Sequence, residues 1–143
     1  MVTPAAVQKV LGGLGKGPQG AGRDFALAQA VREGLPYSVL EHLIDEGIVE
    51  EREVEMYFIA RRTLYSRRLK ATLSREQSDI VVRLARIQAM ADDVLGRREQ
   101  ACAWLREPNG ALSGQIPLAL LDTEEGGRLV EAVLGRIAHG IVE

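Results

Sequence analysis

The sequence has a single cysteine and only two histidines, and these shortages exclude several kinds of site. Cys102 alone cannot form an internal disulfide or a cysteine-rich zinc site. His42 and His139 stand far apart without the spacing of metal ligands, so we expect no metal and no cofactor. No apolar run approaches the ~20 residues that span a bilayer, so we expect no membrane segment.

The first residues also lack the pattern of a secretory signal, which is a basic start followed by a long apolar core. Together with the single cysteine, this absence leads us to expect a reducing cytoplasm as the compartment. The composition itself is typical of a globular protein, since 46% of the 143 residues are apolar and 27% are charged. A chain of this length has room for one ordinary domain or two small ones.

The net charge of −2 hides a difference between the two halves of the chain. Residues 1–75 carry 11 basic residues against 9 acidic ones, whereas residues 76–143 carry 7 against 11. The segment 61–75 is the most unbalanced, because it has six basic residues and no acidic one. A local cationic stripe in an acidic protein indicates contact with a polyanion. The six residues are Arg61, Arg62, Arg67, Arg68, Lys70 and Arg75.

Glycine is concentrated near the start of the chain, and we expect residues 1–21 to form a flexible tail. The run 11–17 could be mistaken for a phosphate loop, but no Gly-Lys-Ser/Thr follows it and no strand pattern precedes it. From Asp24 onward apolar residues recur at helical spacing, without a convincing strand pattern. We therefore predict an all-α fold, with one domain over 22–75 and another over 76–143. The predicted helices cover about 24–33, 38–46, 51–58, 60–70, 75–95, 98–106, 118–121 and 124–139.

Several helix ends carry residues with a capping mechanism. Ser74 and Gln77 form a capping box, in which each side chain accepts a hydrogen bond from the other residue's backbone. Gly96 is expected to end the long helix that follows, and Thr123 to cap the last helix. Apolar spacing in that last helix predicts a buried stripe of Leu129, Val130, Val133, Leu134 and Ile137.

The segment 58–68 has the spacing of a helix-turn-helix, in which Ile59 and Leu64 anchor the second helix. Arg61 and Arg62 would then start that helix, where side chains reach base edges, and arginine suits bidentate contact with guanine. Charge alone fits a solvated basic helix face about as well, and the turn spacing favours DNA binding. The glutamates just upstream would have to face away from DNA or weaken the binding. The expected phosphate contacts are Thr63, Tyr65, Arg67 and Arg68.

The segment 101–118 places a tryptophan-bearing helix before a tight Pro-Asn turn. Trp104 is expected in the core, and Asn109 is expected to bond its own backbone and fix the turn. Cys102 is interpreted as a buried, inert thiol, because no basic neighbour is arranged to activate it. No Ser/His/Asp constellation, metal-ligand spacing or facing carboxylate pair is found, so we expect no catalytic residue and no enzyme.

The pattern A-x-x-W-L-x-x-P-N-x-A-L-x-G-x-x-P-L, from Ala101 to Leu118, resembles the toxin-binding domain of Xre/MbcA/ParS-type antitoxins. Leu121-Asp122-Thr123-Glu124 and the run 136–140 fit the same family, and the resemblance covers roughly residues 22–143. It implies an Xre-like helix-turn-helix bundle followed by a small helical toxin-binding domain. Ala60 departs from the repressor pattern, which usually has serine there, so a possible cap or phosphate contact is missing.

The resemblance also implies the partners. Members of the family are encoded beside a toxin of the RES type, which resembles ADP-ribosyltransferases and destroys NAD, and they neutralise it and are expected to repress their own operon. A cationic pocket for the NAD pyrophosphate would suit the acidic half of this chain. The alternatives are a dimeric regulator without a toxin partner and a small-molecule sensor, although no pocket for a sensor is evident.

The last three residues of the chain would suit the cationic NAD pocket of the toxin, because Ile141 and Val142 are apolar and Glu143 adds acidic groups. A frayed terminus without a role is an equally good interpretation, and the turn around Asn109 could inhibit instead. We further expect a homodimer, with apolar surface from the helices over 80–95 and 129–137. The predicted toxin-binding residues are Asn109, Leu112, Arg128, Arg136, His139, Ile141, Val142 and Glu143.

Overall fold

The computed structural model describes residues 3–12 and 23–140, and within these ranges the chain is all-α, as predicted. No described residue belongs to a strand, and only two isolated bridges pair extended backbone. The elements in chain order are α1 (Pro4–Val10), α2 (Arg23–Glu33), α3 (Tyr37–Asp45), α4 (Glu51–Tyr57), α5 (Arg61–Lys70), α6 (Arg75–Leu95), α7 (Arg98–Arg106), the 3-10 helices η1 (Gly110–Leu112) and η2 (Pro117–Asp122), and α8 (Glu124–Ala138).

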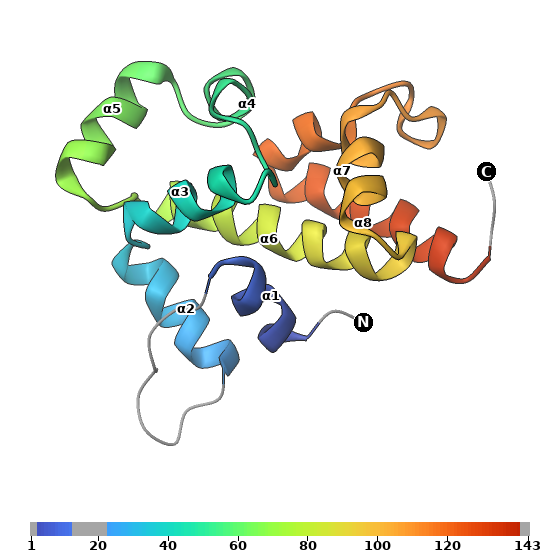
Figure 1. Cartoon of the computed structure of the whole chain (residues 1–143), viewed down its shortest axis with the longest axis horizontal. Helices are drawn as coiled ribbons and strands as arrows, with labels where there is room; N and C mark the ends of the chain where they lie inside the picture. Colours follow the sequence, from blue (N-terminus) through green and yellow to red (C-terminus); the bar gives the residue numbers. More distant parts are fainter. Residues whose placement is uncertain (1–2, 13–22, 141–143) are drawn as a thin grey trace.

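The long helix α6 is the centre of the fold, and α1, α2, α7 and α8 pack against it (Figure 1). Its predicted ends are confirmed. Ser74 Oγ accepts a hydrogen bond from the Gln77 amide at 3.1 Å, and Gln77 Oε1 accepts one from the Ser74 amide at 2.9 Å. Gly96 ends the helix in the left-handed region at φ 86°. Because neighbours surround it, α6 buries even polar residues such as Ser78 and Gln88.

The loop between α2 and α3 is bonded to the loop between α5 and α6. The Leu73 amide donates to the Leu35 carbonyl at 2.9 Å, and the Leu35 amide donates to Ser78 Oγ at 2.8 Å. Gly34 makes this approach possible, because its φ is 94° and a Cβ there would collide with the Leu73 carbonyl. Both ends of the segment that holds α3, α4 and α5 are therefore fixed to the start of α6.

The prediction of a flexible tail over residues 1–21 is wrong for the first part of this range. Residues 4–10 form helix α1, whose N-cap Thr3 accepts a hydrogen bond from the Ala6 amide at 3.1 Å. Val7, Val10 and Leu11 are buried, and α1 packs along α6. Apolar burial orders this segment although glycine follows it. Residues 13–21 lie outside the described residues.

Two packing predictions also need correction. Leu129 was expected in the buried stripe of the last helix, but it is 56% exposed, while Val130, Val133 and Leu134 are buried. Cys102 is half-buried rather than buried. In contrast, Trp104 packs against the core as predicted, although it remains partly accessible.

Candidate functional site

Helices α4 and α5 form a helix-turn-helix, joined by the three residues 58–60. Ile59 and Leu64 are 4% and 3% exposed, so both predicted anchors are confirmed. The Ile59 amide donates to the Val54 carbonyl at 2.8 Å and closes the turn. Ala60 occupies the N-cap of α5 without a side-chain hydrogen bond, as expected from the missing serine.

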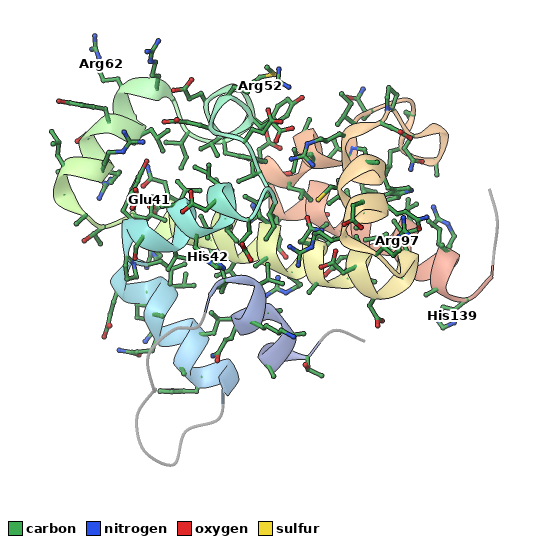
Figure 2. All side chains as sticks on the ribbon, viewed as in Figure 1. Glu41, His42, Arg52, Arg62, Arg97 and His139 are labelled. Carbon is green, nitrogen blue, oxygen red and sulfur yellow. The ribbon has the colours of Figure 1, made fainter. Side chains whose placement is uncertain are left out.

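The burial of Leu64 determines which residues α5 presents to solvent. Arg62, on the far side of the helix from Leu64, projects away from the body of the protein (Figure 2). Of the other predicted DNA contacts, Arg61, Thr63 and Tyr65 are exposed. The remaining two are the half-buried Arg67 and the exposed Arg68.

Two glutamates of α4, Glu51 and Glu55, face α5, whereas DNA binding would require them to face away from the DNA. Arg68 Nη2 lies 3.0 Å from Glu51 Oε1, and Arg61 Nε lies 3.8 Å from Glu55 Oε1. The Arg68 guanidinium also lies over the Tyr37 ring, 5.6 Å from its centre. Arg68 thus connects α5 with α3 and α4, which leaves less of its charge for a phosphate than the sequence prediction assumed.

The second predicted site begins at the turn after α7. Asn109 Oδ1 accepts a hydrogen bond from the Ala111 amide at 2.9 Å, which confirms that this side chain fixes the turn. The Asn109 amide donates to the Gln115 carbonyl at 3.0 Å, so the loop closes on itself. Leu112 is only 6% exposed. A direct toxin contact by Leu112 is therefore not compatible with this conformation, because the side chain belongs to the core.

The other predicted toxin-binding residues lie along α8. Arg128 is exposed and pairs with acidic residues of its own helix, at 3.8 Å from Glu124 and 3.6 Å from Glu125. Arg136 is partly buried further along the helix. His139 is exposed at the C-cap, at the far end of the molecule from Arg62 (Figure 2). Residues 141–143, with Ile141, Val142 and Glu143, lie outside the described residues.

The described ranges hold no group of three His, Cys, Asp or Glu residues placed to bind a metal ion. None of the helices in the same ranges is long and apolar enough to cross a membrane.

Comparisons with known proteins match both halves of this arrangement. Residues 26–86 match the antitoxin Xre-like helix-turn-helix domain, and residues 90–140 match the antitoxin Xre/MbcA/ParS C-terminal toxin-binding domain. Antitoxin Xre of Pseudomonas putida is 34% identical over 118 residues, which are 82% of this chain and 74% of that protein. Antitoxin Xre of Photorhabdus laumondii is 29% identical over 115 residues, or 78% of each chain. A Prs ADP-ribosylating antitoxin of a Sphingobium strain is 35% identical over 77 residues, or 48% of each chain.

Fold and matches together define a helix-turn-helix protein with an appended helical toxin-binding domain. The chain belongs to the Xre antitoxin family. The resemblance seen in the sequence is thereby confirmed, and α1 lies outside both matched ranges.

Sequence reasoning missed two features of these surfaces. Leu69 of α5 is 71% exposed, and its apolar side chain alone did not indicate that it faces solvent. Counting from the buried Leu64 at 100° per residue would have found it, because Leu69 then falls on the outer side of the helix with Arg62. The second feature is the ion pair between Glu53 and Arg106, which joins α4 to α7 and has no local signal.

Proposed function

We propose that this antitoxin neutralises a RES-type, NAD-degrading toxin by direct binding that blocks the toxin's active site. The observation that carries the proposal is the match of residues 90–140 to the toxin-binding domain, in the half of the chain with 7 basic against 11 acidic residues. The name of one relative, Prs ADP-ribosylating antitoxin, refers to the chemistry that a RES-type toxin resembles.

The blocking element we propose is the end of α8 with residues 141–143. Ile141 and Val142 are apolar and Glu143 is acidic, which suits a cleft with apolar walls and cationic groups. The end of α8 and helix α5 lie at opposite ends of the molecule (Figure 1). A toxin bound at the end of α8 would therefore leave α5 accessible to DNA.

Operator binding through α5 is the second part of the proposal, and with it repression of the protein's own operon in a bacterial cytoplasm. We also propose a homodimer, because one recognition helix gains specificity when two half-sites are paired. Helix α6 was expected to contribute to the dimer, but it is already covered within its own chain. A dimer therefore has to use other surface, such as the side of α8 that exposes Leu129.

The test is to purify the co-expressed pair, measure the mass of the complex, and follow NAD consumption with and without residues 141–143. If the truncated antitoxin binds the toxin while NAD loss resumes, the tail blocks the active site. If it binds and still inhibits fully, blocking comes from the turn around Asn109 or from hindered access. If no complex forms with the intact chain, the protein is a dimeric regulator without a toxin partner.

A further inference from the structure

Helix α5 exposes two large apolar side chains one turn apart. Leu69 is 71% and Tyr65 is 63% exposed, on a helix whose own core contact is Leu64. Residues four apart on a helix are neighbours, with Cβ atoms about 5–6 Å apart. An exposed apolar pair of this kind costs hydration free energy in the isolated protein, so a partner that covers it would be favoured.

Two basic residues lie close to the pair on α5. Arg62 lies two turns before Leu69 on the same side of α5, and Lys70 follows Leu69 directly. Neither side chain has an ion pair among residues 3–12 and 23–140, and both are exposed. A second copy of this face would bring like charges together, whereas a polyanion with apolar groups would satisfy both features.

Double-stranded DNA offers that combination in its major groove, where phosphates flank the C5-methyl groups of thymine. We propose that Tyr65 and Leu69 contact thymine methyl groups, so that α5 reads A·T pairs in addition to any guanine read by Arg62. This inference rests on the proposed DNA binding and changes the role of Tyr65, which the sequence assigned to phosphate.

The helix spacing limits which thymines can be read. Base pairs rise about 3.4 Å per step along the duplex, so two side chains about 5–6 Å apart reach bases within about two steps. We therefore expect the preferred half-site to contain two thymines that are adjacent or separated by one base pair. One of them contacts Leu69 and the other contacts Tyr65.

The experiment uses the full chain and a duplex selected by it from a pool with a randomised centre. Each thymine of the selected duplex is then replaced by deoxyuridine, which lacks only the methyl group. Wild-type affinity is expected to fall about two- to fourfold at each of two positions, because each methyl contact buries about one apolar carbon. In Leu69→Ala one of the two losses disappears, and in Tyr65→Ala the other does.

Phe25→Ala is the matched control, because Phe25 is 56% exposed but lies on α2. It is expected to keep both thymine-to-uracil losses, whatever its effect on overall affinity. Equal affinity of the wild type for thymine and uracil duplexes overturns the inference and leaves DNA binding intact. Losses that persist unchanged in Leu69→Ala and Tyr65→Ala overturn it as well, since other residues then read the methyl groups. A pool from which no duplex is enriched overturns the DNA part of the proposed function itself.

Discussion

Arg106 of α7 donates two parallel hydrogen bonds to Glu53 of α4, from Nε to Oε2 and from Nη2 to Oε1, both at 2.8 Å. Arg106 also donates to the Ile48 carbonyl at 3.3 Å and to the Cys102 carbonyl at 3.2 Å, while Glu53 Oε1 accepts from the Glu50 amide at 2.8 Å. The hydrogen bonds to the Glu53 carboxylate and the negative charge of that carboxylate raise the pKa of Arg106 above its usual value, against the opposing effect of burial. The first helix of the helix-turn-helix is therefore held by a residue of the toxin-binding domain, two positions before the Pro108-Asn109 turn.

Replacing Arg106 by methionine is expected to lower the free energy of unfolding by about 2–3 kcal/mol, because Glu53 is left buried and unpaired. The matched control is Arg128→Met, which removes two exposed ion pairs on α8 and is expected to cost less than about 1 kcal/mol. Urea unfolding of both variants measures the difference. Equal stability of the two variants would mean that the pair is as weak as a surface ion pair.

The same pair predicts an effect at a distance on DNA binding. Glu53→Gln keeps the hydrogen bond to the Glu50 amide but loses its charge, so α4 is held less firmly against α7. We expect operator affinity to fall severalfold while the α5 residues remain unchanged. Toxin binding is expected to change less, since α4, which holds Glu53, lies away from the C-terminal end of α8 (Figure 1). Gel shift and pull-down assays on one preparation compare the two effects.

Two glycines of α8 are expected to respond in opposite ways to alanine. A Cβ at Gly126 would collide with the Leu120 carbonyl of η2, so Gly126→Ala forces η2 and α8 apart and costs about 1–3 kcal/mol or more. Gly135 has nothing within 4 Å of the same position, and Gly135→Ala is expected to stabilise the protein by up to about 1 kcal/mol. Thermal unfolding separates the two. A neutral Gly126→Ala would show that the start of α8 packs less closely than described.

DNA binding is expected to depend on the arginines of α5 to different degrees. Arg61→Ala together with Arg62→Ala is expected to abolish the preference for guanine positions of the operator, at about 1–3 kcal/mol for each lost guanine contact, while the preference for thymine positions remains. Of the two, Arg62 is expected to matter more, since Arg61 lies 3.8 Å from Glu55. Arg67→Ala is expected to weaken binding to all sequences and reduce the salt dependence by about one phosphate contact.

Gel shifts across a range of salt concentrations measure both effects, and toxin binding serves as the readout that should not change. Arg68→Ala is expected to lower the salt dependence less than Arg67→Ala does, because Glu51 and Tyr37 already hold its guanidinium. Preference for guanine positions that survives the loss of both Arg61 and Arg62 would contradict the assignment of these two residues as the guanine readers of α5.

The parts of the fold that could be predicted depend on residues close together in the sequence. Ser74, Gly96, Thr123 and Asn109 each act on backbone groups within a few positions, so their roles follow from residue type and spacing. The helix-turn-helix followed for the same reason, through Ile59 and Leu64. Family resemblance then supplied the proposed partner, which no local pattern contains.

What could not be predicted depends on tertiary contacts. Glu53 and Arg106 are 53 positions apart, and nothing near either residue indicates the other. Leu112 and Leu129 show the same limit, because apolar spacing identifies a helical face without showing which edge of it is covered. Leu112 was assigned to the toxin and lies in the core, whereas Leu129 was assigned to the core and lies at the surface.

Helix α1 was not predicted from the sequence, and it gives the last prediction. Thr3-Pro4 has the form of an N-cap followed by proline at the first helical position, and Val7, Val10 and Leu11 have helical spacing. Because Val7 is 4% exposed against α6, Val7→Ser is expected to cost about 2–3 kcal/mol, from lost apolar burial and a buried hydroxyl. Lys9→Ser on the same helix is the matched control, since Lys9 is exposed, and it is expected to be neutral within about 0.5 kcal/mol.

Hydrogen exchange of the α6 amides gives a second measurement, in which Val7→Ser speeds exchange along the side of α6 that α1 covers. If both serine variants unfold at the same urea concentration, α1 contributes nothing to stability, and the first 12 residues behave as the tail that their glycine-rich continuation suggested.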